Sequence, residues 1–175
     1  MENNIVCADD FGLTKSVNRA IIDVFNKGNL NLTSLMTNMP GTKDAIELAK
    51  IHNKLEVGLH FNITEGTSIV GKSSLTDENA IFFSRNKLLK KIFLGQIKKE
   101  DVLIEFKEQL NKCYNNNINI KTIDSHQHIH SLNFIFKVIL PEIIKRNLTI
   151  RSCFAEIRFS LRRFNHLLSN IYLYR

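Results

Sequence analysis

The chain has 175 residues, of which 43% are hydrophobic, and a formal net charge of +7 at neutral pH. This length and hydrophobic content predict a single folded domain over residues 1–175 and exclude a disordered chain. The basic residues are spread over many segments and no nucleic-acid motif accompanies them, so we expect solvated helix faces and no nucleic-acid partner.

The cysteines and the N-terminal segment bear on the cellular compartment. Cys7, Cys113 and Cys153 lie far apart and form no CxxC pair, which argues against a disulfide framework and against a cysteine metal site. Acidic residues stand near the N-terminus, where a secretory signal carries basic and then apolar residues. No apolar run approaches the ~20 residues of a membrane span. We therefore expect a cytoplasmic protein without membrane association.

Strand and helix patterns alternate along the chain. Strands are expected at residues 4–8, 32–38, 55–64, 121–126 and 148–153, and helices at residues 16–28, 41–53, 86–97, 99–116, 133–147 and 157–175. Ser16 and Thr42 are placed to cap the first two helices. Residues 65–85 show little periodicity and predict a long loop, which in a compact domain is usually functional or disordered.

This alternation predicts an α/β fold with a parallel sheet, which is either a barrel or an open doubly wound sheet. In both architectures the chemistry lies at the carboxyl ends of the strands. The first expected strand runs into Asp9 and Asp10, the third into His60, and the fourth into Asp124 and His126. Three strands thus deliver carboxylates and imidazoles to one edge of the sheet.

Each of these residues also has a purely structural interpretation. Paired aspartates after a strand can form a turn or cap a helix, and a lone histidine such as His60 is commonly a hydrogen-bonded core residue. The three histidines at every second position, His126, His128 and His130, would share one face of an extended strand. The convergence of these acids and histidines at three strand ends instead favours a metal site, because one carboxylate and two imidazoles are a common catalytic ligand set. Of the two adjacent aspartates, one can bind the metal and the other can then act as a base towards a metal-bound water.

Three segments in this order, "ADDFG", "VGLHFNITEG" and "DSHQHIH", resemble the YdjC-like carbohydrate deacetylase family over residues 4–151. The resemblance implies a distorted (β/α) barrel and a magnesium or zinc ion bound by Asp10, His60 and His126. It makes Asp9 the catalytic base. The reaction that it implies is the removal of N-acetyl groups from amino sugars or chitooligosaccharides.

The resemblance also implies supporting roles for the remaining polar residues of the third segment. Asp124 looks like a residue that supports His126, either by a contact with the ligand from outside the metal site or by holding the strand end. His128 and His130 are expected to line the pocket, orient ligands or contact the sugar, and the sequence does not divide these roles between them.

The sequence departs from the family pattern near its end. The family carries a late histidine, in an "HPG"-like motif, which looks like the acid that protonates the leaving amine, and residues 152–175 form a divergent basic tail without it. The chain also has only about five expected strands, too few to close an eight-stranded barrel. We therefore expect a truncated gene product, a fragment or a shortened family member, with an incomplete barrel and a tendency to self-associate. One alternative function is a family member that binds metal or sugar without efficient turnover, and another is the hydrolysis of a different amide or an ester.

Overall fold

The computed structural model describes residues 5–152 of the chain. Its strands are β1 (Cys7–Phe11), β2 (Leu32–Leu35), β3 (Glu56–Phe61), β4 (Thr122–Ser125) and β5 (Thr149–Ile150). Its helices are α1 (Lys15–Asn26), α2 (Thr42–Ile51), α3 (Arg85–Phe93), α4 (Lys99–Asn115) and α5 (Asn133–Lys145), and a 3-10 turn, η1 (His126–Ser131), follows β4. The elements alternate as the sequence predicts. The helix expected at residues 157–175 lies outside the described residues.

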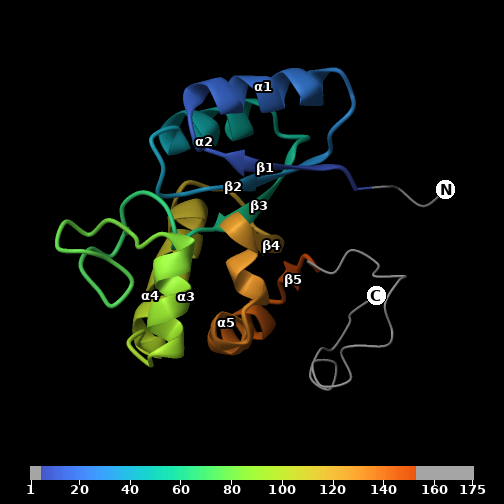
Figure 1. The fold of residues 1–175 in the computed structure, drawn as a ribbon. Coiled ribbons are helices and arrows are strands. Elements are labelled where there is room, and N and C mark those ends of the chain that lie inside the picture. Colours follow the sequence, from blue (N-terminus) through green and yellow to red (C-terminus); the bar gives the residue numbers. More distant parts are fainter. Residues whose placement is uncertain (1–4, 153–175) are drawn as a thin grey trace, which may run out of the picture.

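The five strands form one parallel sheet, in which they lie side by side in the order of the chain (Figure 1). A doubly wound sheet reverses its strand order at a switch point, whereas a barrel adds each new strand to the same edge. The sequential order is therefore the winding of a (β/α) barrel, of which the described strands form an open part. The predicted parallel α/β fold is confirmed.

The helices pack in neighbouring pairs along this sheet. α1 contacts α2 and β1, whereas α4 contacts α5 and β3, and Figure 1 shows the two pairs as separate groups. Strand and helix side chains share one buried core, in which the ring of Phe61 on β3 meets the ring of Phe106 on α4 edge-on at 5.1 Å between centroids. None of the described helices has the length and apolar character that a membrane span requires.

Both predicted helix caps are wrong. α1 begins at Lys15, so its cap is Thr14, two residues before Ser16, and Thr14 accepts a hydrogen bond from the N–H of Val17 at 3.2 Å. Ser16 therefore lies inside the first turn. Thr42 is the first residue of α2, and its hydroxyl instead donates to the carbonyl of Met36 at 2.9 Å. In this position it ties the start of α2 to the chain just after β2.

The long loop at residues 65–85 is a packed segment. Two antiparallel bridges, Thr67 with Ile81 and Thr76 with Phe82, fold it back on itself. Leu75 at its centre is fully buried. The segment therefore forms a fixed wall beside the carboxyl end of β3.

One buried carboxylate on α4 holds this wall in place. Glu105 is 1% exposed and accepts hydrogen bonds from the hydroxyl of Ser68 at 2.6 Å and from the N–H groups of Ile69 and Val70 at 3.2 and 3.3 Å. Gln109, one turn further along α4, donates to the same carboxylate at 2.9 Å. A single acidic side chain thus satisfies three donors of the loop and one of its own helix.

We expect Glu105→Ala to lower the free energy of unfolding by about 1–3 kcal/mol, because it leaves buried donors without an acceptor. Urea denaturation followed by circular dichroism measures this change. Glu108→Ala on the exposed face of the same helix is the matched control and should have little effect. Equal stabilities of the two variants would contradict the role given to Glu105.

Candidate metal centre

Asp9 and Asp10 lie within β1, at a point where the strand is irregular. The pairing with β2 shifts between Ala8 and Phe11, where three steps along β1 match two steps along β2. Asp10 has a φ of 64°, in the left-handed region that residues other than glycine adopt only uncommonly. Neighbouring side chains of a regular strand point to opposite faces. The bulge allows both carboxylates to join one group of contacts, since Asp10 meets His60 and Asp9 meets Arg151.

Two histidine rings converge on one oxygen of Asp10. The Nε2 atom of His60 lies 3.1 Å from Asp10 Oδ1, and the Nδ1 atom of His126 lies 2.9 Å from the same oxygen. The potential ligand atoms of the three residues all lie within 4.8 Å of one another. The structure therefore brings together the three residues that the sequence predicted as metal ligands. That they bind a metal stays a prediction.

The carboxylate of Asp124 lies behind His60. Its Oδ1 atom is 2.6 Å from His60 Nδ1, and its Oδ2 atom accepts a hydrogen bond from the hydroxyl of Ser34 at 2.8 Å. The sequence placed Asp124 behind His126. It supports His60 instead, because His60 and Asp124 are register partners on the neighbouring strands β3 and β4.

The pKa shifts of this cluster show that it stabilises positive charge. Hydrogen bonds with His126 and His60 hold the pKa of the Asp10 carboxyl well below its usual value. Burial lowers the pKa of the His60 ring, but the hydrogen bonds to Asp10 and Asp124 outweigh burial and raise the pKa to about 9. The environment that favours a proton on His60 also favours a metal cation at the same nitrogen.

The donor set fits a divalent metal ion. Two imidazoles and one carboxylate suit zinc and similar transition metals, and they leave further coordination positions for water and substrate. The second nitrogen of His60 is held by a carboxylate, as is usual for a metal-binding histidine. Asp10, His60 and His126 would hold such an ion.

Asp9 is held by an arginine that the sequence analysis did not single out. Arg151, directly after β5, donates from Nη1 to Asp9 Oδ1 at 2.6 Å and to Asp124 Oδ2 at 2.9 Å. These contacts raise the pKa of the guanidinium further, so Arg151 stays charged. The position of Arg151 at the end of a strand could have identified it, because that rule had already located the acids and histidines.

Cys7, Asp9 and Asp124 form a second group with suitable spacing for a metal ion. However, the guanidinium of Arg151 already lies against both carboxylates of this group. Burial raises the pKa of the Cys7 thiol, which disfavours the thiolate that metals require. We therefore assign the two carboxylates, Asp9 and Asp124, to the binding of Arg151.

The three histidines of the third sequence segment have different surroundings. An extended strand is excluded as their conformation, because η1 follows β4 directly and Gln127 and His128 have φ values of 55° and 56°. His126 reaches Asp10, whereas His128 is exposed. His130 is buried, with Nδ1 against the hydroxyl of Ser125 at 2.5 Å and Nε2 against the carbonyl of Arg151 at 3.0 Å. His130 therefore holds the backbone of the residue that binds Asp9.

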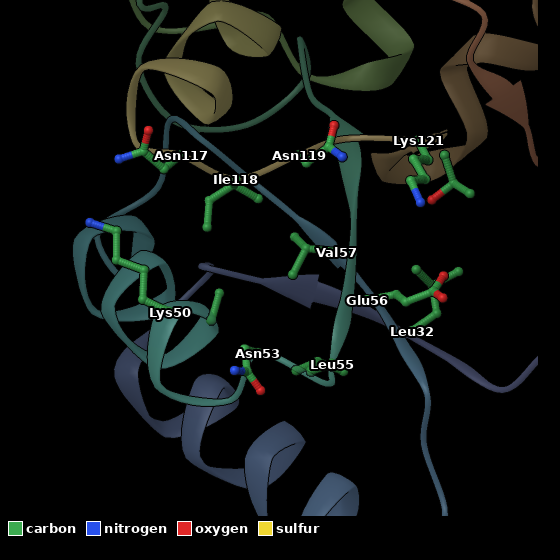
Figure 2. Close-up of a pocket in the computed structure, with 12 residues that line it drawn as sticks. Leu32, Lys50, Asn53, Leu55, Glu56, Val57, Asn117, Ile118, Asn119 and Lys121 are labelled. Atoms are coloured by element: carbon green, nitrogen blue, oxygen red, sulfur yellow. The ribbon is translucent and has the colours of Figure 1, made fainter.

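A pocket of about 410 Å³ lies at the other end of the sheet (Figure 2). It is lined by the first residues of β2, β3 and β4, which are Leu32, Glu56 and Thr122, and by the end of α2. Parallel α/β sheets carry their chemistry at the carboxyl ends of the strands. The candidate site is therefore the cluster around Asp10, and not this pocket.

Fold and site together define a parallel α/β protein of barrel-type winding, with a carboxylate–histidine cluster at the carboxyl ends of its strands. The family described as YdjC-like protein matches residues 4–174. The chain belongs to the YdjC-like family, as its three sequence segments predicted. The match extends beyond residue 151, where the resemblance of those segments ends.

Similar proteins include bacterial carbohydrate deacetylases. The chain is 35% identical over 148 residues to the carbohydrate deacetylase of Clostridium beijerinckii and 36% identical over 147 residues to that of Geobacillus stearothermophilus. Each match covers 84% of this chain and 58% of the relative, so the chain spans little more than half the length of these relatives. Among solved structures, a protein from Enterococcus faecalis V583 proposed to cleave cellobiose-phosphate superposes with a TM-score of 0.76 and 28% identity, over 85% of this chain and 57% of the other.

We expect His60→Ala to abolish stoichiometric binding of Zn²⁺, because it removes one of two converging imidazoles. Metal content after dialysis, measured by atomic emission, checks this outcome. His128→Ala is the matched control, since it removes an exposed histidine near the site, and it should keep the ion. Equal metal content in the two variants would show that the cluster around Asp10 is not the metal centre.

Proposed function

We propose that this chain is a metal-dependent hydrolase that removes N-acetyl groups from amino sugars or chitooligosaccharides. The observation that carries this proposal is the convergence of His60 and His126 on Asp10, with Asp9 one residue away and held by Arg151. The carbohydrate deacetylase relatives support the reaction class and imply a sugar substrate. Zn²⁺ and Mg²⁺ are the proposed ions, and the two imidazole ligands favour Zn²⁺.

The residues of the site divide the work in the proposed reaction. Asp10, His60 and His126 would hold a divalent ion, which would supply Lewis-acid activation of water and of the acetyl carbonyl. Asp9 acts as general base, and its side chain is 34% exposed and therefore accessible to a water molecule. Arg151 fixes the orientation of Asp9, while His130 and the strand pairing to Ile123 hold the backbone of Arg151.

A second candidate function is binding of metal or sugar without efficient turnover. Amide hydrolysis also needs a proton donor for the leaving amine, and the contacts of the described histidines limit which of them can donate it. Both ring nitrogens of buried His130 already have partners at 2.5 and 3.0 Å. His130 is therefore not available as the acid, and His128 is the exposed histidine of the segment.

Acetate release from N-acetylglucosamine oligomers, with and without a chelator, tests the proposed reaction. An aryl acetate assayed in parallel has a leaving group that needs no proton from the protein. Chelator-sensitive acetate release from the oligomers supports the deacetylase. Chelator-sensitive cleavage of the aryl ester alone supports the second candidate, and no metal-dependent hydrolysis of either compound contradicts the proposed activity.

We expect Asp9→Asn to keep the bound metal and to lower kcat by ~10²–10⁴-fold, which is the typical contribution of a positioned general base. Metal content and kcat are measured on the same preparation. Asp10→Asn should instead lose metal. The reverse pattern, with metal lost from Asp9→Asn and kept by Asp10→Asn, would exchange the roles of the two aspartates.

We expect Arg151→Met to lower kcat on the hydrolysed substrate by about 10²-fold, because a misplaced catalytic group loses activity of that order. Metal affinity should change less, since Asp124 keeps its contacts with His60 and Ser34. Arg146→Met is a matched control, because Arg146 pairs with Glu142 on α5, away from the site. A fall in metal affinity as large as the fall in kcat would place Arg151 with the ligands rather than with the base.

A further inference from the structure

Glu65 is an acidic residue beside the site to which the sequence analysis gave no role. It is located where the wall of residues 65–85 begins, shortly after the end of β3. Its Oε2 atom lies 3.0 Å from Nε2 of His126, the nitrogen that faces away from Asp10. Both nitrogens of the His126 ring therefore contact a carboxylate.

The surroundings of His126 repeat those of His60. His60 has Asp10 at Nε2 and Asp124 at Nδ1, whereas His126 has Asp10 at Nδ1 and Glu65 at Nε2. In each ring one nitrogen faces the shared oxygen and the other faces a separate acid. Metal-binding histidines commonly donate their second N–H to such an acid, which fixes the tautomer and the orientation of the ring.

The backbone of Glu65 is fixed by two asparagines. Asn62 is fully buried, and its side-chain oxygen accepts from the N–H of Glu65 at 3.2 Å while its amide donates to the carbonyl of Glu65 at 2.8 Å. Asn38 donates to the same carbonyl at 3.0 Å. Asn62 is fixed in turn by Gln109 of α4, which bonds its N–H and its carbonyl. The Glu65 backbone is thus held independently of its side chain.

Exposed ion pairs generally contribute little to stability, and the side chain of Glu65 is 49% exposed. Two observations distinguish this contact from such a pair. The His126 side chain is only 14% exposed, and the backbone of Glu65 is already ordered by the buried side chain of Asn62. The contact therefore needs no further ordering of the Glu65 backbone, and its expected effect is on the orientation of the ring.

We infer that Glu65 is a positioning residue that accepts the Nε2–H of His126, so that Nδ1 of this ring is presented to the metal ion. This inference rests on the metal centre of the proposed function. It assigns the two histidines opposite ligand atoms, Nε2 for His60 and Nδ1 for His126. It also gives the first residue of the 65–85 wall a direct connection to the metal centre.

Zn²⁺ affinity, measured by competition with a chromophoric chelator, tests the inference on the full chain. We expect Glu65→Ala to weaken binding about 10-fold, the lower end of the range for partners of metal-binding histidines, because Glu65 is half exposed. Glu65→Gln should weaken it less, since the amide oxygen still accepts a hydrogen bond. Glu78→Ala, an exposed acid of the same loop, is the control and should bind as the wild type does.

Nitrogen-15 NMR of the histidine rings in the Zn²⁺-loaded protein supplies a readout independent of affinity. The expected result is a protonated Nε2 and a metal-bound Nδ1 in His126, with the reverse in His60. Unchanged affinity in Glu65→Ala, or a protonated Nδ1 in His126, would overturn the inference while leaving the metal centre in place. Absence of Zn²⁺ binding by the wild type would overturn the metal centre, and this inference with it.

Discussion

The buried carboxylate of Asp124 is the interaction on which the candidate site depends. It lies on β4 and binds His60 on β3, Ser34 on β2 and the guanidinium of Arg151 after β5. Arg151 continues the connection to Asp9 on β1. A buried carboxylate without partners is strongly unfavourable. The ionised state of Asp124 and the alignment of the five strand ends therefore maintain each other.

The bulge in β1 is the second constraint, because it places two consecutive acids at one end of the sheet. A left-handed conformation at a residue such as Asp10 costs on the order of 1–3 kcal/mol, although aspartate tolerates it better than most residues. Contacts of His60 and His126 with its carboxylate offset this cost. The bulge also separates the partners of the two acids, since Asp9 turns to Arg151. This separation fits the proposed roles of Asp9 as base and Asp10 as metal ligand.

The sequence predicted the parts of the site that follow from strand polarity, and missed those that depend on local backbone geometry. Asp10, His60 and His126 were located because parallel strands place their carboxyl ends together. The histidine run was ambiguous, because its period of two suits a strand, and η1 begins only where Gln127 turns left-handed. Arg151 was missed although it follows a strand end, because it is one of 24 lysines and arginines and its contact with Asp9 joins the first and last strands of the described sheet.

Local charge decides the chemistry of this site, and the net charge of the chain does not. The chain carries +7 overall, yet four carboxylates lie in the described site. Asp9 and Asp124 contact the guanidinium of Arg151, whereas Asp10 and Glu65 contact histidine rings. The proton favoured on His60 and the proposed divalent ion are two ways to supply the missing positive charge. The two histidines are held by different parts of the fold. His60 is held by Asp124 of the sheet. His126 is held by Glu65, whose backbone is bound by Asn62, and Asn62 is bound by a side chain of α4. A disturbance of the wall should therefore act on the proposed metal centre first through His126, because His60 has its own support from Asp124 within the sheet.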